Sequence, residues 1–154
     1  MAYWLMKSEP DVFGIDHLKA RPKQTEPWSG VRNYQVRNMF RDQMKPGDQA
    51  FFYHSSCEVP GIYGVMTIVS DAYPDPTQFD PNSEYYDKAS KREEPRWLMV
   101  DVKFKRKLKR PITLAELREH EKELPGFRLL APGNRLSVVP VQPEHWDRIL
   151  SLVQ

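Results

Sequence analysis

The longest strand-like stretch of this chain is Trp97-Leu-Met-Val-Asp-Val-Lys-Phe-Lys-Arg-Lys-Leu108. Its apolar residues recur at even-numbered positions, namely Leu98, Val100, Val102, Phe104 and Leu108. This alternation is typical of a strand with one face in a core and the other in water. It predicts a fold built on a β-sheet.

Four shorter segments extend the predicted sheet. Residues 2–7, 49–54, 62–69 and 136–141 are apolar runs bounded by polar or turn-forming residues. The second and third runs are separated by a loop that holds Pro60-Gly61, which predicts a hairpin or meander. The 14 prolines are spread along the chain and favour brief strands and turns over a long helical bundle.

Helices are predicted between these strands. Asp11 can cap a short helix over residues 12–18. Apolar residues at helical spacing predict a second helix after Gly30 that ends at Lys45-Pro46-Gly47. The Thr113-x-x-Glu116 pattern is a capping box, and residues 143–153 form a closing helix.

Two segments lack periodicity. Residues 21–27 are polar and are predicted to be a loop. Residues 73–94 are predicted to be an ordered surface excursion, because four aromatic side chains supply apolar area that can anchor it. The whole pattern predicts one domain over residues 1–154, mixed α/β and mainly of β-barrel type, with short curved strands and flanking and inserted helices.

Composition excludes several classes of protein. The 40% hydrophobic and 12% aromatic residues are those of a globular chain. No apolar run approaches a membrane span, and the start lacks a basic region followed by an apolar core, so neither a membrane protein nor secretion is expected. Cys57 is the one cysteine, which fits a reducing cytoplasm and predicts a cytoplasmic protein. A net charge of +2 cannot by itself indicate nucleic-acid binding.

No metal or cofactor is expected. The histidines have none of the spacings of zinc ligands; they are His17, His54, His120 and His145. The seven glycines form no phosphate-binding loop, and there is no Gly-x-Ser-x-Gly elbow. Nucleoside-triphosphate chemistry and hydrolases with that elbow are therefore set aside.

The segment with most chemical interest is Trp28-Ser29-Gly30-Val31-Arg32-Asn33-Tyr34. Trp28 stands in a polar loop without core periodicity, so its indole could stack on a planar ligand, with Ser29 and Asn33 bonding to the ligand's edge. The alternatives are that Trp28 anchors the loop and that Asn33 caps the following helix.

Polar pairs end two of the predicted strands. Lys7-Ser8 follows the first strand, and His54-Ser55 follows the 49–54 strand. They could converge at one rim as ligand contacts, or they could only terminate the strands.

The long strand also carries a run of basic residues: Lys103, Lys105, Arg106, Lys107, Lys109 and Arg110. Because its apolar residues take the even positions, the odd-numbered lysines share one face. That face suits phosphate groups, and an ordinary solvated face is the equally weighted alternative.

The chain resembles the EVE domain family over nearly its whole length. The motifs that carry the resemblance, in order, are Tyr3-Trp-Leu-Met-Lys-Ser-Glu-Pro10, Trp28–Gln35 with Arg37-Asn38, Phe52–Ser55, Gly61–Val65, Tyr73–Asp80, Tyr85-Tyr-Asp87, Pro95-Arg-Trp97 and Arg135-Leu-Ser-Val138. The resemblance implies a PUA-like pseudobarrel related to YTH domains, and a domain that recognises a modified base.

By this resemblance, a specific set of residues surrounds the ligand. Lys7, Ser8 and Trp28 would face it, and the segment Arg135-Leu136-Ser137 would close the floor of the pocket. The residues around the ligand would be Ser29, Asn33, Tyr34, His54 and Ser55. No second aromatic wall is assigned, because Trp97 lies in a strand that is predicted to be buried.

The expected function is therefore non-catalytic binding of DNA or RNA with a modified base, or of a modified nucleoside. Candidate bases are 5-methylcytosine, 5-hydroxymethylcytosine and N6-methyladenine, and a monomer is the default state. The alternative is a hydrolase of modified nucleosides with Lys7 as nucleophile or base. A third alternative is a protein-interaction domain that uses residues 73–87.

Overall fold

A computed structural model describes residues 1–153. Its strands are β1 (Tyr3–Ser8), β2 (Thr25–Pro27), β3 (Gln49–His54), β4 (Gly61–Ile68), β5 (Tyr73–Pro74), β6 (Leu98–Met99), β7 (Asp101–Thr113) and β8 (Val138–Val141). Its α-helices are α1 (Pro10–Phe13), α2 (Ile15–Ala20), α3 (Tyr34–Asp42), α4 (Leu114–Glu119) and α5 (Pro143–Ser151). Short 3₁₀ turns are η1 (Pro22–Gln24), η2 (Pro76–Phe79), η3 (Glu121–Glu123) and η4 (Arg128–Leu130).

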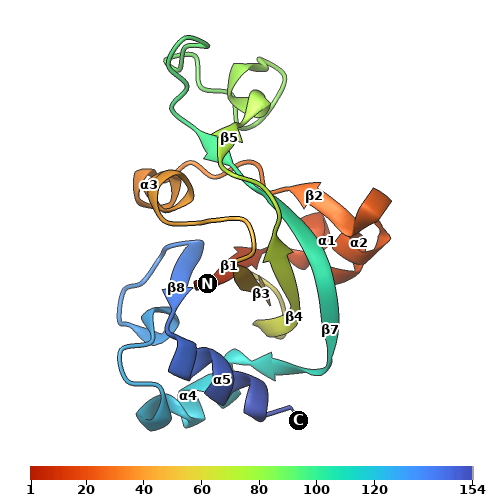
Figure 1. Cartoon of the computed structure of the whole chain (residues 1–154), viewed down its shortest axis with the longest axis vertical. Helices are drawn as coiled ribbons and strands as arrows, with labels where there is room; N and C mark the ends of the chain where they lie inside the picture. Colours follow the sequence, from red (N-terminus) through yellow and green to blue (C-terminus); the bar gives the residue numbers. More distant parts are fainter. Residues whose placement is uncertain (154) are drawn as a thin grey trace.

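Six of the strands form one curled sheet in the order β2-β7-β4-β3-β1-β8 (Figure 1). β1 and β3 run parallel, and every other neighbouring pair in this sheet is antiparallel. Register shifts interrupt the β3–β4 and β4–β7 ladders, and such bulges bend and twist a sheet. The predicted mixed α/β fold on a curved half-barrel sheet is confirmed.

The core fills the inside of the curled sheet. Trp4, Leu5 and Met6 are all buried, so β1 is covered on both faces, as its unbroken apolar run predicts. α5 closes one end: Trp146 stacks on Phe51 of β3 with ring centroids 3.9 Å apart.

The structure corrects three details. Residues 21–27 are more than a loop, because β2 pairs with residues 101–103 of β7. The helix predicted over 12–18 is two short helices separated by Gly14, and Glu9, not Asp11, holds the N-cap position of α1. The long strand begins at Asp101 after a separate short strand, and Trp97 precedes both.

Residues 73–99, which include the excursion predicted over residues 73–94, project beyond α3 in Figure 1. β5 and β6 pair at its base. The buried amide of Gln78 holds its interior: Nε2 donates to the carbonyls of Asp75 (2.7 Å) and Trp97 (2.8 Å), and Oε1 accepts from the Ser90 hydroxyl (2.6 Å). The excursion is therefore ordered, as predicted. In residues 1–153, no helix is long and apolar enough to span a membrane.

Candidate functional site

The polar pairs at the strand ends converge. Because β1 and β3 run parallel, Ser8 lies opposite His54 at their carboxyl ends. The Ser55 amide donates to the Ser8 carbonyl (2.9 Å), and the Lys7 amide donates to the Ser137 carbonyl (2.8 Å). Segments far apart in the sequence therefore meet at one edge of the sheet.

Lys7 supplies a partly buried amine at this edge. Burial lowers the pKa of its ammonium below the ordinary value. Within residues 1–153, its side chain makes no ion pair. Ser8 is committed differently, because its hydroxyl donates to the Phe13 carbonyl (2.6 Å) and fixes α1 over the end of β1.

Trp28 packs against Phe13 and Phe52, and these three rings form what we call the Trp28 cluster. Its ring lies edge-on to Phe52 (centroids 5.4 Å apart) and to Phe13 (6.4 Å). Only 7% of Trp28 is exposed, so the loop-anchor interpretation describes its packing. Its indole N–H has no hydrogen-bond partner in the described part of the chain, which leaves one polar atom at this anchor for a ligand.

His54 is occupied by the protein itself. Its Nε2 accepts a hydrogen bond from the Ile15 amide (3.1 Å), and its ring stacks on Tyr63 (centroids 3.9 Å apart). Burial holds the pKa of His54 below its ordinary value. The imidazole therefore fixes the start of α2 behind the Ser8–Ser55 edge.

The 28–34 segment runs into α3. Asn33 caps the helix, because its Oδ1 accepts from the Val36 amide (3.1 Å), as the capping interpretation predicts. Ser29 is exposed. Tyr34 is 50% exposed and packs on Trp97 with ring centroids 4.8 Å apart, so Trp97 is more than a core residue.

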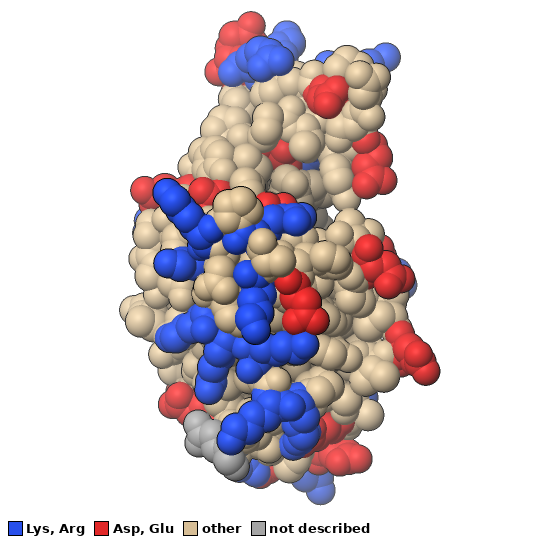
Figure 2. Space-filling view, turned by 90° about the vertical axis from the view of Figure 1, so that its right-hand side faces the viewer, with Lys and Arg blue, Asp and Glu red and all other residues tan. Residues whose placement is uncertain are grey.

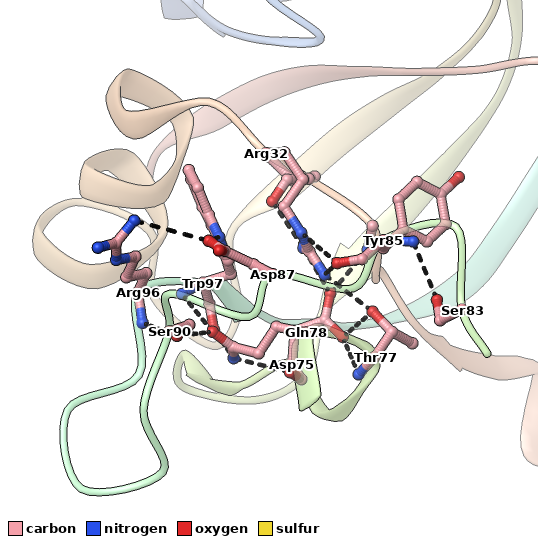
Figure 3. Close-up of polar contacts among 12 residues, drawn as sticks. Arg32, Asp75, Thr77, Gln78, Ser83, Tyr85, Asp87, Ser90, Arg96 and Trp97 are labelled. Carbon is pink, nitrogen blue, oxygen red and sulfur yellow. Dashed lines mark hydrogen bonds and ion pairs between the residues drawn. The ribbon is translucent and has the colours of Figure 1, made fainter. Parts of the chain in front are cut away.

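A buried polar network fixes this segment to the excursion (Figure 3). Asp75 is fully buried; its Oδ2 accepts from the Gly30 amide (2.8 Å) and from Arg32 Nη1 (3.1 Å). Arg32 also donates to the Thr77 hydroxyl (3.0 Å) and to the Tyr85 carbonyl (2.8 Å). Burial alone would raise the pKa of Asp75, but hydrogen bonds from Thr77, Gly30 and Arg32 outweigh it and hold that pKa below the ordinary value.

The sequence does not single out Arg32 and Asp75 as site residues. The sequence marks these two residues only by their positions in the motifs at 28–35 and 73–80 that resemble the EVE family. Nothing local in those motifs reveals a pairing between residues 43 positions apart.

The segment from Arg135 to Ser137 reaches the site through Ser137, whose backbone meets Lys7. Leu136 is buried and Arg135 is exposed. Two surface hollows lie away from this edge, one beside Leu124–Pro132 and one beside Met1 and Pro46.

The basic run of β7 lies on one face together with α2, and Figure 2 shows Lys and Arg side chains gathered there. The four odd-numbered lysines are exposed, as the strand pattern predicts, and so are Arg106 and Arg110 at even positions. Lys107 pairs with Asp16 (2.9 Å), and Lys105 donates to Gln49 Oε1 (2.9 Å). Arg21 connects this face to the Trp28 cluster, because its guanidinium lies 5.2 Å from the centre of the Phe13 ring.

The curled six-stranded sheet, with short helices around it and strand ends that converge at one edge, defines a mixed α/β domain of the predicted class. The match of the EVE domain model to residues 2–152 shows that the chain belongs to the EVE domain family. It is similar to human thymocyte nuclear protein 1, at 49% identity over 98% of this chain and 73% of that protein.

Solved structures agree with this assignment. Human THYN1 protein in complex with 5-methylcytosine-containing DNA superimposes with a TM-score of 0.92, at 48% identity, over 100% of this chain and 98% of that one. The YTH domain of Mmi1, solved with RNA, matches with a TM-score of 0.56 and 15% identity over 99% of this chain and 77% of that one. The second likeness concerns the fold alone and agrees with the fold predicted from the sequence.

One expectation is corrected by the relatives. A single free cysteine predicted a cytoplasmic protein, but the human and mouse relatives, 49% and 50% identical to this chain, are named as nuclear proteins. The cytoplasmic prediction is therefore wrong. A reducing environment is common to both compartments, so cysteine content cannot distinguish them.

Proposed function

We propose that this protein binds DNA that carries 5-methylcytosine and holds the modified base at the edge formed by Lys7, Trp28 and Ser55. The observation that carries the proposal is the human THYN1 complex with 5-methylcytosine-containing DNA, which matches this chain over its full length. N6-methyladenine, 5-hydroxymethylcytosine and RNA are the competing ligands.

The chemistry of the edge supports a base as ligand. The partly buried Lys7 ammonium, the free Trp28 N–H and the exposed Ser29 offer donors beside apolar rings, the combination typical of sites for planar polar ligands. We infer that the segment 135–137 and the helix cap at Asn33 complete the rim. His54 supports this rim from behind through α2.

The basic face supplies the second part of the proposal. Flipping a base out of a duplex costs a few kcal/mol, and one stacking contact returns about 1–3 kcal/mol. Contacts between phosphates and the lysines at 103, 105, 107 and 109 would offset the remainder. Arg21, the C-cap residue of α2, lies against Phe13 of the Trp28 cluster and pairs with Glu26 (3.3 Å), so we infer that a DNA backbone on the basic face could reach it.

The decisive measurement is the affinity for matched short duplexes and single strands that differ only in one base. We expect 5-methylcytosine to bind about tenfold to hundredfold more tightly than cytosine, the discrimination that one methyl group allows. Equal affinity for all bases would reduce the protein to a binder of the DNA backbone. Tighter binding of one of the competing ligands would make that ligand, and not 5-methylcytosine, the base that the protein recognises.

The variant Lys7→Met tests the site with little risk to the fold, because Met keeps most of the apolar stem and removes only a partly desolvated charge. We expect it to unfold at the wild-type denaturant concentration and to lose most of the preference for the methylated base. Trp28→Phe is the companion variant, since Trp28→Ala would leave a cavity in the Phe13–Phe52 cluster. Lys122→Met on the exposed turn η3 is the control, and binding by it should be unchanged.

The same samples test the hydrolase alternative. Chromatography of the recovered DNA after digestion to nucleosides should return the modified base intact. Conversion of the modified base by the wild type but not by Lys7→Met would show that the protein is an enzyme.

A further inference from the structure

Tyr34 is the most exposed aromatic residue next to the candidate site. Half of its surface is open to solvent, whereas only 7% of Trp28 is. The two rings belong to separate clusters, because Trp28 packs on Phe13 and Phe52 while Tyr34 packs on Trp97. Tyr34 follows Trp28 by six residues (34 − 28), which limits their Cα separation to about 20 Å.

The tyrosine is held rigidly in spite of its exposure. Trp97 lies beneath it at 4.8 Å and is itself fixed, because its indole N–H donates to Asp87 Oδ2 (2.8 Å, Figure 3). The guanidinium of Arg37 lies 4.9 Å from the centre of the Tyr34 ring.

Arg37 is fixed in turn by its own hydrogen bonds. Its Nε and Nη2 both donate to Asn38 Oδ1, at 3.0 and 2.9 Å, and its Nη1 donates to the Arg96 carbonyl (3.3 Å). An exposed ring that is held in place loses little entropy when a second planar group stacks on it.

The surroundings favour a planar group attached to an anion. The guanidinium of Arg37 lies over the ring, and Tyr34 is the first residue of the nine-residue helix α3, whose N-terminus carries partial positive charge. A base with its phosphate combines both features.

We propose that Tyr34 stacks on the nucleotide next to the modified base, and that Trp97 and Arg37 position it for this contact. The inference rests on the proposed function and assigns Tyr34 a partner other than the modified base itself. Stacking on Tyr34 would add to the phosphate contacts that offset the cost of flipping the modified base.

The test combines protein variants with strands that lack one base. Tyr34→Ala and Tyr34→Phe are measured by fluorescence anisotropy on a 5-methylcytosine strand, and on two strands with an abasic site directly 5′ or 3′ of the modified base. On the intact strand, Tyr34→Ala should bind about tenfold to hundredfold more weakly, and Tyr34→Phe should bind as the wild type does. On the abasic strand that lacks the base stacked on Tyr34, the wild type and Tyr34→Ala should bind equally, because the tyrosine has no base to contact.

Other variants keep the result interpretable. Tyr86→Ala removes a tyrosine of similar exposure (44%) from the excursion and should not change binding. Thermal unfolding of Tyr34→Ala checks that the fold is retained. The ratio of affinities for methylated and unmethylated strands should stay constant in Tyr34→Ala, because the modified base is held elsewhere.

The outcomes separate this inference from the proposed function. Equal weakening of Tyr34→Ala on all three strands, or no weakening at all, overturns the inference while a preference of the wild type for 5-methylcytosine survives. A methylation preference that disappears in Tyr34→Ala would place Tyr34 against the modified base and also overturn it. Absence of binding by the wild type overturns both.

Discussion

Among single residues, Asp75 has the widest effect on the candidate site. Its fully buried carboxylate joins the excursion to the 28–34 segment through Gly30 and Arg32. An Asn side chain has the same shape but lacks the charge that pairs with Arg32. The position of the 28–34 segment therefore depends on the hydrogen bonds that the Asp75 carboxylate accepts from Gly30 and Arg32.

We expect Asp75→Asn to lower the free energy of unfolding by about 2–3 kcal/mol at neutral pH, because it leaves the Arg32 guanidinium without its counter-charge. Since the pKa of Asp75 is held below its ordinary value, the wild type has this stabilisation above about pH 5 and loses it as the pH falls below about 4. Urea unfolding at several pH values should show the two proteins converging in acid. The exposed Asp71→Asn is the control, and a difference that persists at low pH would contradict the account.

Gly30 gives a second test of the same loop. Its φ of +84° lies in the left-handed region, and a Cβ there would lie 2.8 Å from the Tyr85 ring. Gly30→Ala should therefore cost about 2–3 kcal/mol, from strain and overpacking together. Gly126→Ala has a similar φ of +77° with nothing within 4 Å, so it should cost about 1 kcal/mol. Equal losses in urea unfolding would show that the close approach of Tyr85 does not matter.

Among the elements, β7 carries the proposed phosphate contacts. Lys103 and Lys109 have no side-chain partner in residues 1–153, whereas Lys107 is paired with Asp16. Replacing Lys103 or Lys109 by Gln should reduce the slope of log affinity against log salt by about 0.9 for each phosphate that the protein no longer neutralises. Affinities for one duplex over a range of salt concentrations measure this slope. Lys122→Gln should leave it unchanged, and unchanged slopes for every variant would make β7 an ordinary solvated face.

The elements also differ in how well sequence predicts them. β1, β3, β4 and most of β7 follow from apolar patterning, because their own side chains form the core. β2 could not be predicted, since three residues show no period and their strand exists through pairing with β7. From the sequence, the convergence of Lys7-Ser8 with His54-Ser55 is only one of two alternatives. The convergence requires β1 and β3 to be parallel neighbours, which the apolar pattern does not specify. The Arg32–Asp75 pair depends wholly on tertiary contact.

For the molecule as a whole, one domain over residues 1–154 remains our proposal, and it predicts a single cooperative unfolding transition that includes the excursion. Trp97 reports on the excursion and Trp4 and Trp146 on the core, so fluorescence and circular dichroism should give coincident curves. A methylated strand at about 100 times its dissociation constant should raise the stability by about 2.7 kcal/mol, and the unmethylated strand at the same concentration by less. Two separate transitions would show that the excursion unfolds independently.

The position of β1 in the sheet has a consequence for synthesis. β1 pairs with β3 on one side and with β8 on the other, so that Tyr3 meets Val141. β1 is therefore made before β3, β4, β7 and β8, and it waits for its second neighbour until the rest of this sheet has been made. During that interval, Trp4, Leu5 and Met6 present an open strand edge, the kind of surface that invites pairing with another chain. Termination of translation between Ser137 and Val138 would remove β8 and make that exposure permanent, so such products are expected to be prone to aggregation even though every residue of the candidate site has already been made.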